Sequence, residues 1–166
     1  MRTDKVYLVG FMAAGKTTVA QELARRLDWR VEDIDIRVEA RERRTVAEIF
    51  AQSGEPYFRA LERAIVAELI PLRHTVVATG GGTFLDPESR ALMKSDGAVF
   101  WLDLPLVELI DRMPADGSRP LASSVAQLEH LYLVRRAAYE DAHVRLDASR
   151  QPAGALVDQI LDWLNG

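Results

Sequence analysis

The chain has 166 residues, of which 48% are hydrophobic and 28% charged, so we expect one domain over residues 1–166 with a substantial core. Its formal net charge is −4 and no long basic tract is present, which argues against non-specific binding to nucleic acid or to an anionic membrane surface. The absence of cysteine excludes disulfides, thiolate zinc sites and a cysteine nucleophile.

Short apolar runs alternate with helical patterns along the whole chain. We expect strands at Lys5–Val9, Trp29–Asp33, Thr75–Thr79, Ala98–Leu102 and His143–Asp147. We expect helices at Lys16–Leu27, Ile36–Arg43, Val46–Gln52, Pro56–Ile70, Pro87–Lys94, Pro105–Met113, Val125–Tyr139 and Pro152–Leu164. Asp86 before Pro87 is a helix-start signal, and Thr45 with Glu48 is a possible capping box. The alternation predicts an α/β fold with a mostly parallel sheet covered on both faces.

The first predicted strand is followed by GFMAAGKTT, residues 10–18. The spacing G-x-x-x-x-G-K-[ST] predicts a phosphate-binding loop, in which backbone N–H groups and the N-terminus of the next helix face a nucleoside triphosphate. Gly10 and Gly15 allow tight curvature, Lys16 can reach the β- and γ-phosphates, and Thr17 can ligate Mg²⁺. The alternative is a chance glycine turn before a helix.

Two acidic residues and a glycine triplet follow the second and third predicted strands, where ligands bind in parallel sheets. Asp33 and Asp35 point to the same side of an extended backbone. One could hold Mg²⁺ through water and the other could accept a proton from a substrate hydroxyl, or the pair could be an acidic turn that caps the next helix. The triplet at 80–82 lets a small ligand approach the backbone, unless it is only a flexible turn.

Several arginines are candidates for binding anions. Arg59 lies near the start of its predicted helix and could clamp a carboxylate, or it could be an ordinary exposed charge. The same two interpretations apply to Arg135 and Arg136. The stretch 112–124 is polar and contains several Gly and Pro residues, which predicts a mobile loop. Arg119 within it could neutralise a transferring phosphate when the loop closes.

Seven segments together make the chain resemble the shikimate kinases, which are P-loop kinases similar to the nucleoside-monophosphate kinases. In chain order they are GFMAAGKTT, DIDIRVE, TVAEIFAQSGEPYFRALE, TGGGT, DRMPADGSRPL, RRAAY and SRQP. The resemblance implies a three-layer α/β/α fold with a five-stranded parallel sheet, a mobile lid at about 112–124 and substrate-binding helices at about 34–61. It implies ATP-dependent phosphorylation of the shikimate 3-hydroxyl, on the route to chorismate and the aromatic amino acids, with Mg²⁺ as cofactor.

The resemblance also implies a role for each matching residue. Shikimate would be contacted by Asp35, Arg59, Glu62, Gly80, Gly81, Gly82 and Arg135. Asp35 would act as the catalytic base, and Glu62 would orient the other residues. The nucleotide would be contacted by Gly10, Ala13, Ala14, Gly15, Lys16, Thr17, Thr18, Arg112, Arg119, Gln151 and Pro152. Of these, Lys16 and the lid arginine Arg119 would also be catalytic. Thr17, and Asp33 through water, would hold the metal. Arg135 is preferred to Arg136 because the family pattern places this arginine four residues before a tyrosine, here Tyr139.

Two positions depart from the family pattern. Ala13 stands where many members have a third loop glycine. Because alanine tolerates positive φ poorly, this predicts either a negative φ at Ala13 or a weakened loop. The segment RRAAY lacks the proline that is common there.

Two other functions remain open at this stage: a related kinase acting on gluconate or a nucleoside monophosphate, and a nucleotide-dependent binding module. The sequence lacks the N-K-x-D segment of a guanine-specific switch and keeps the acidic and basic site residues of a kinase. We expect a monomer that binds ATP and shikimate but neither nucleic acid nor membrane. No signal or membrane-spanning segment is visible, so we expect a cytoplasmic protein.

Overall fold

The computed structural model describes residues 1–113 and 124–166. Among them, five parallel strands form one sheet in the order β2-β3-β1-β4-β5. The strands are β1 (Lys5–Val9), β2 (Arg30–Asp33), β3 (Thr75–Ala78), β4 (Ala98–Asp103) and β5 (Val144–Asp147). The predicted five-stranded parallel sheet is confirmed, and each strand begins and ends within one residue of its predicted bounds.

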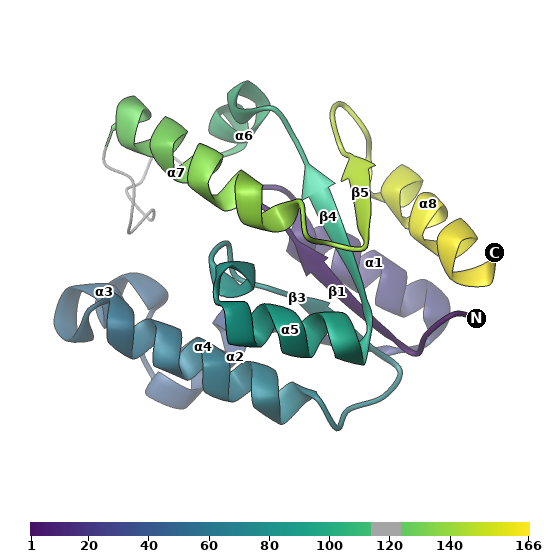
Figure 1. Ribbon diagram of the computed structural model, residues 1–166, viewed down its shortest axis with the longest axis horizontal. Coiled ribbons are helices and arrows are strands. Elements are labelled where there is room, and N and C mark those ends of the chain that lie inside the picture. The colour runs from purple at the N-terminus through teal and green to yellow at the C-terminus, as the bar shows by residue number, and fades with distance from the viewer. Residues whose placement is uncertain (114–123) are drawn as a thin grey trace.

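Helices cover both faces of the sheet, so the predicted three-layer α/β/α arrangement is also confirmed. In Figure 1, α1 and α8 lie on one face, and α4, α5 and α7 lie on the other. The helical segments are α1 (Lys16–Leu27), α2 (Ile34–Glu42), α3 (Val46–Ser53), α4 (Glu55–Leu69), the short 3-10 helix η1 (Thr83–Leu85), α5 (Pro87–Asp96), α6 (Leu106–Arg112), α7 (Val125–Tyr139) and α8 (Ala153–Asn165). The short helix η1 was not expected from the sequence.

Side-chain caps explain where several helices begin. Asp86 accepts a hydrogen bond from the Ser89 N–H at 2.9 Å and starts α5, with Pro87 in its first turn. Thr45 and Glu48 form the predicted capping box of α3. These local signals act within one turn, which is why the sequence alone predicts them well.

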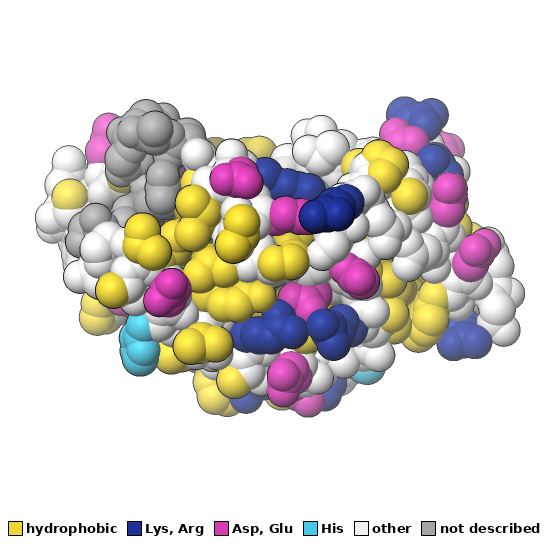
Figure 2. All heavy atoms as spheres, turned by 90° about the horizontal axis from the view of Figure 1, so that it is seen from above, with side chains coloured by type: hydrophobic (Ala, Val, Ile, Leu, Met, Phe, Trp, Pro, Cys, Tyr) yellow, Lys and Arg dark blue, Asp and Glu magenta, His cyan; other side chains and the backbone are white. Residues whose placement is uncertain are grey.

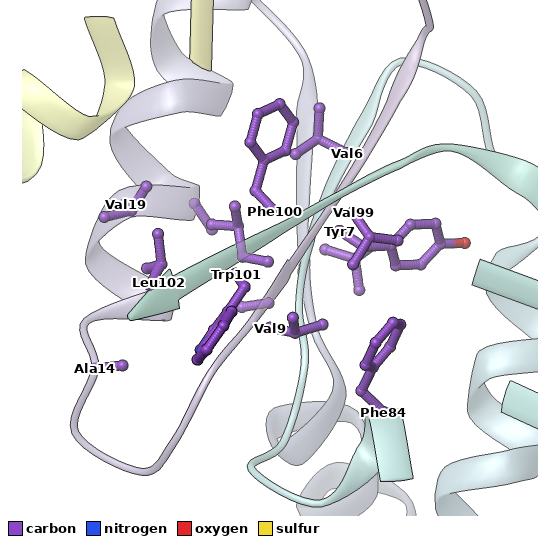
Figure 3. Packing of buried hydrophobic residues seen from close by; sticks show 14 of the residues in the cluster. Val6, Tyr7, Val9, Ala14, Val19, Phe84, Val99, Phe100, Trp101 and Leu102 are labelled. Carbon is purple, nitrogen blue, oxygen red and sulfur yellow. The ribbon is translucent and has the colours of Figure 1, made fainter. Parts of the chain in front are cut away.

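Strand β4 shows why the sheet needs a continuous apolar sequence. All six of its residues are buried. The Phe100 ring packs edge-on against Trp163 of α8, with ring centroids 5.3 Å apart. The next residue, Trp101, packs against Tyr139 of α7, with centroids 5.9 Å apart. Figure 3 shows Phe100 and Trp101 on opposite sides of the strand. Since successive residues of a strand face opposite ways, helices on both faces require apolar residues at every position.

The loops that carry the predicted site leave from neighbouring strands. Strands β1 and β3 are hydrogen-bonded neighbours, with Leu8 opposite Ala78. Just after β3, the backbone N–H and the hydroxyl of Thr79 both donate to the Leu8 carbonyl, at 3.2 and 2.9 Å. The phosphate loop follows β1 and the glycine triplet follows Thr79, so the two segments start side by side at the same edge of the sheet.

Helices α6 and α7 have an apolar outer surface. Val107 of α6 and Val125, Leu133 and Val134 of α7 are all exposed. Figure 2, which views the molecule from the side of these helices, shows hydrophobic side chains gathered there. Within the described parts of the chain, no helix is both long enough and apolar enough to cross a lipid bilayer.

Candidate active site

The loop between β1 and α1 borders a cavity of about 380 Å³. Residues from the ends of three strands and from α6 line it together: Met12, Ala13, Ala14, Gly15, Lys16, Thr17, Thr18, Asp33, Asp35, Thr79, Gly81 and Arg112. Gly10 lies at the base of the loop, where a Cβ would come within 2.9 Å of the Leu102 carbonyl oxygen of β4. Most of the predicted nucleotide and metal ligands therefore share one cavity.

Lys16 folds back onto the loop that carries it. Its Nζ donates to the carbonyl oxygens of Gly10 and Phe11, at 2.6 and 3.0 Å. Burial lowers the pKa of Lys16 to about 8, and the negative charge of Asp35 partly opposes this. An anionic phosphate in the loop would favour the charged ammonium and raise this pKa again.

Ala13 adopts a left-handed backbone conformation, with φ of 65°. The predicted negative φ is therefore wrong. The local reason is the turn in which the Ala14 N–H donates to the Phe11 carbonyl at 3.2 Å, a curl that takes the chain through the left-handed region at Ala13. Such a conformation costs a non-glycine residue about 1–2 kcal/mol. The alternative expectation, that alanine at this position weakens the phosphate loop, stays a prediction.

We expect Ala13→Gly to raise the free energy of unfolding by about 0.5–1 kcal/mol, because relief of the left-handed strain exceeds the extra backbone entropy that glycine loses on folding. Urea denaturation measures this change. Ala14→Gly is the matched control: Ala14 is buried and is not among the positive-φ residues, so losing its methyl group should destabilise the protein. Equal destabilisation by the two substitutions would contradict the strain at Ala13.

Thr17 and Asp33 lie in direct contact. The Thr17 hydroxyl donates to Asp33 Oδ2 at 2.9 Å. The other carboxylate oxygen, Oδ1, accepts from the Ile36 N–H at 3.1 Å and caps α2. Asp33 therefore caps α2, as the interpretation as an acidic helix cap predicted. It also contacts Thr17 of the phosphate loop, as the interpretation as a metal-binding residue requires. A hydroxyl beside a carboxylate fits Mg²⁺, which prefers oxygen ligands and usually completes its shell with substrate phosphates and water.

Asp35 lies in the first turn of α2 and not in an extended segment. The side-by-side geometry expected from strand alternation is therefore wrong, because α2 begins two residues earlier than predicted. Asp35 nevertheless lines the phosphate cavity. Its Oδ1 is buried and has no hydrogen-bond partner among the described residues. Burial, followed by the charges of Glu62 and Asp33, raises the pKa of Asp35 to about 6. A carboxylate with this pKa is ionised but basic at neutral pH, as a general base requires.

Each glycine of the triplet faces a charged side chain that leaves no room for a Cβ. At Gly80, a Cβ would lie 2.9 Å from both Asp35 Oδ1 and Glu62 Oε2. At Gly81 it would lie 2.7 Å from Arg135 Nη1. At Gly82 it would lie 2.6 Å from both Nη1 and Nη2 of Arg59. None of the three has a positive φ. A Cβ at any of the three positions would therefore push a charged side chain of the site out of its place. Four charged groups from three helices meet over this one segment.

Arg59 projects from the first turns of α4 and is mostly buried. Its Nη1 donates to Glu62 Oε1 at 2.5 Å, and its Nη2 lies 3.3 Å from Glu55 Oε1. Glu62 is itself 2% exposed, so this is a buried and oriented ion pair. The interpretation of Arg59 as an ordinary exposed charge does not fit this environment.

Arg135 of α7 is 4% exposed and forms no hydrogen bond or ion pair with any residue that the structure describes. Burial lowers the pKa of Arg135, and the delocalised guanidinium nevertheless stays protonated in proteins. A buried cation without an anionic partner is costly, which indicates that an anion binds beside it. Arg136 points elsewhere, because both of its terminal nitrogens donate to Asp103, at 2.6 and 3.2 Å.

A second cavity, of about 490 Å³, joins the two predicted arginines. Arg59, Arg135 and Gly82 all line it. Since Gly81 lines the phosphate cavity, the two cavities meet at the glycine triplet. The arrangement therefore offers a place for a phosphate donor on one side of the triplet and for a small anionic acceptor on the other.

The remaining predicted residues lie farther out or outside the described chain. Gln151 and Pro152 follow β5 and lead into α8, and neither lines the two cavities described above. Gln151 Oε1 accepts from Gln159 Nε2 at 2.9 Å. Arg119, and all of the expected lid except residues 112, 113 and 124, lies outside the described residues.

Two buried hydroxyls that the sequence analysis did not assign to the site hold the glycine triplet. Thr83 Oγ1 accepts from the Gly80 N–H at 3.0 Å and donates to Glu62 Oε2 at 2.6 Å. Tyr139 OH donates to the Gly81 carbonyl. The position of Thr83 directly after three glycines was the available signal, since a hydroxyl there can bond back to the turn.

A phosphate loop, a nearby basic carboxylate and a buried guanidinium pair define a P-loop phosphotransferase with a small anionic acceptor. A family model described as shikimate kinase matches residues 12–165. The shikimate kinase of Persephonella marina is 37% identical over 94% of this chain and 96% of its own. That of Neisseria gonorrhoeae is 42% identical over 81% of each chain. The solved shikimate kinase from Acinetobacter baumannii in complex with shikimate has a TM-score of 0.93 and 32% identity, covering 98% of this chain and 93% of that one. The chain belongs to the shikimate kinase family, and it is a kinase.

Proposed function

We propose that this kinase transfers the γ-phosphate of ATP to the 3-hydroxyl of shikimate by direct in-line displacement, giving shikimate 3-phosphate and ADP. The observation that carries this assignment is the pair of buried polar atoms that have no hydrogen-bond partner among the described residues, Asp35 Oδ1 and Arg135 Nε. An acceptor with a hydroxyl for the first and a carboxylate for the second satisfies both. Shikimate, which the solved relative from Acinetobacter baumannii binds, has both groups.

The acceptor half of the site binds and orients shikimate. Its carboxylate lies between Arg59 and Arg135, where two guanidiniums can donate paired hydrogen bonds. Its ring packs beside the triplet at 80–82, among the charged side chains that lie over these glycines, and its 3-hydroxyl faces Asp35. Glu62 keeps Arg59 in place, as supported by the 2.5 Å contact between Arg59 Nη1 and Glu62 Oε1.

The donor half of the site binds ATP. Backbone N–H groups of the loop at 10–18, including that of Ala13, face the phosphates, and the N-terminus of α1 adds its positive end. Ala14 borders the phosphates, while its own N–H stays bonded to the Phe11 carbonyl. Lys16 exchanges the Gly10 and Phe11 carbonyls for the β- and γ-phosphates. Arg112 and the Gln151–Pro152 segment contact the adenine. Arg119 is proposed as the lid arginine and lies outside the described residues.

In the chemical step the shikimate hydroxyl oxygen forms a bond to the γ-phosphorus, and the bond from that phosphorus to the β–γ bridging oxygen breaks. The hydroxyl proton goes to Asp35, whose raised pKa suits it as acceptor. Thr17, and Asp33 through water, would hold Mg²⁺. When bound, Mg²⁺ neutralises charge on the β- and γ-phosphates. Lys16, in the phosphate cavity, stabilises the transferring phosphoryl group, and Arg135, in the second cavity, stabilises the acceptor anion.

The wider assignment is one kinase domain over residues 1–166, with the region 34–61 serving the acceptor side. We propose that it acts as a monomer in the cytoplasm, without binding nucleic acid or membrane. The net charge of −4 and the lack of a long basic tract support the last part.

An ADP-release assay tests the proposal. We expect turnover with ATP and Mg²⁺ only when shikimate is present, loss of turnover with EDTA, and recovery when Mg²⁺ is returned. The methyl ester of shikimate, which lacks the carboxylate charge, should have a KM at least about tenfold higher, because it leaves both arginines without an anion. Gluconate should not replace shikimate. ADP release that does not depend on shikimate would overturn the assignment.

A further inference from the structure

Thr83 carries a buried hydroxyl that links the glycine triplet to α4. The residue is 1% exposed and stands at the start of η1. Its Oγ1 accepts from the Gly80 N–H at 3.0 Å and lies 2.6 Å from Glu62 Oε2. The Gly80 N–H can only donate, so the single hydroxyl proton of Thr83 is left for Glu62. The direction of this hydrogen-bond chain is therefore fixed.

Glu62 passes the constraint on to Arg59. The carboxylate is 2% exposed, and its two oxygens bond to different partners: Oε2 accepts from Thr83 and Oε1 accepts from Arg59 Nη1 at 2.5 Å. The guanidinium of Arg59 lies directly over Gly82, within 2.6 Å of where a Cβ would be. With both oxygens bonded, the carboxylate has one orientation, and the guanidinium that it holds has one place above the triplet.

We propose that Thr83 is a positioning residue for shikimate, which acts through Glu62 to hold Arg59 where the substrate carboxylate binds. The inference rests on the proposed role of Arg59. Without the hydroxyl, Glu62 Oε2 and the Gly80 N–H lose their partner, and the carboxylate is free to rotate away from Arg59. Neither Thr83, Glu62 nor Arg59 lines the phosphate cavity. Loss of the Thr83 hydroxyl should therefore weaken binding of shikimate and leave the nucleotide site intact.

Thr83→Val tests the inference, because valine keeps the branched shape of threonine and replaces only the hydroxyl with a methyl group. We expect the KM for shikimate to rise about tenfold, while the KM for ATP and kcat change by less than about twofold. Thr83→Ser keeps the hydroxyl and should restore the KM for shikimate to within about twofold of the wild type. Thr83→Ala also removes the hydroxyl and should show the same changes in KM and kcat. It provides the test if the valine variant folds poorly.

Thr75→Val is the matched control. Thr75 is also fully buried and lies at the other end of β3, where its hydroxyl donates to the Arg73 carbonyl at 2.9 Å. It should change neither KM. If Thr83→Val and Thr83→Ala keep the wild-type KM for shikimate, or if they raise both KM values alike, the inference is overturned, because the hydroxyl then has no role or only a general packing role.

A double-mutant cycle separates this inference from the assignment of the site. If Thr83 acts through Arg59, adding Thr83→Val to Arg59→Gln should raise the KM for shikimate by less than about twofold beyond Arg59→Gln alone. Full additivity would overturn the relay and leave the site assignment standing. If Arg59→Gln alone leaves the KM for shikimate unchanged, the proposed carboxylate site is wrong and the relay falls with it.

Discussion

Asparagine at position 35 is expected to lower kcat by about 10²–10⁴-fold and to change the KM values for ATP and shikimate by less than about threefold. The amide has the shape of the carboxylate and can still hydrogen-bond the hydroxyl, but it cannot accept the proton that leaves when the oxygen attacks. Steady-state kinetics with both substrates varied measures the two effects separately. An Asp35→Asn variant with wild-type kcat would exclude Asp35 as the base.

The pH profile provides the control for this substitution. Burial and the neighbouring charges of Glu62 and Asp33 raise the pKa of Asp35 to about 6. In the wild type, kcat/KM for shikimate, which reports the free enzyme, should therefore fall as the pH drops through about 6, because the base becomes protonated, and Asp35→Asn should lack this limb. Since the pKa is higher in the folded protein than in the unfolded chain, ionised Asp35 destabilises the fold above pH 6. Asp35→Asn should then have a higher Tm than the wild type at pH 8.

Alanine at position 59 is expected to raise the KM for shikimate and to cost about 2–4 kcal/mol in kcat/KM, with kcat and the KM for ATP much less affected. The substitution removes one of the two guanidiniums proposed to bind the substrate carboxylate, and it leaves the buried Glu62 Oε1 without its partner. Arg41→Ala is the control: Arg41 also pairs with a glutamate of α4, Glu68, but both side chains are exposed, so the kinetics should not change.

The comparison between the two substrates decides the interpretation of Arg59→Ala. A rise confined to the KM for shikimate supports a carboxylate site between Arg59 and Arg135. A similar rise in the KM for ATP would place the defect in the whole cleft, and a wild-type KM for shikimate would remove Arg59 from the acceptor site altogether.

The fold was largely predictable from the sequence because its signals are local. Apolar runs, caps such as Asp86 with Pro87, and the glycine spacing of the phosphate loop each act within a few residues. The two errors also concern local geometry. The φ of Ala13 is set by the curl of the loop and not by the preference of alanine, and Asp35 is helical because the Asp33 side chain caps α2 at Ile36.

The candidate site was less predictable because it depends on distant segments. The residue types do not distinguish Arg135 from Arg136, and only the spacing to Tyr139 in the family pattern favoured Arg135. The structure separates the two because Asp103, 33 residues from Arg136, binds Arg136. The triplet at 80–82 was expected to leave room for a ligand, and the structure adds that the site's own side chains take the place of each Cβ. Thr83 was missed because its partner Glu62 lies 21 residues away. The role of Arg119 stays a prediction.

The separation between donor and acceptor is set by the register of two strands. Leu8 is paired with Ala78, and Thr79 bonds twice to the Leu8 carbonyl just before the triplet begins. A slip of one residue would carry the acceptor segment about 3.3 Å along the strand. A misplacement of only about 1 Å can cost 100-fold in rate. The backbone hydrogen bonds between β1 and β3 thus fix the distance between the phosphate loop and the glycine triplet, and with it the distance that we propose separates the two substrates.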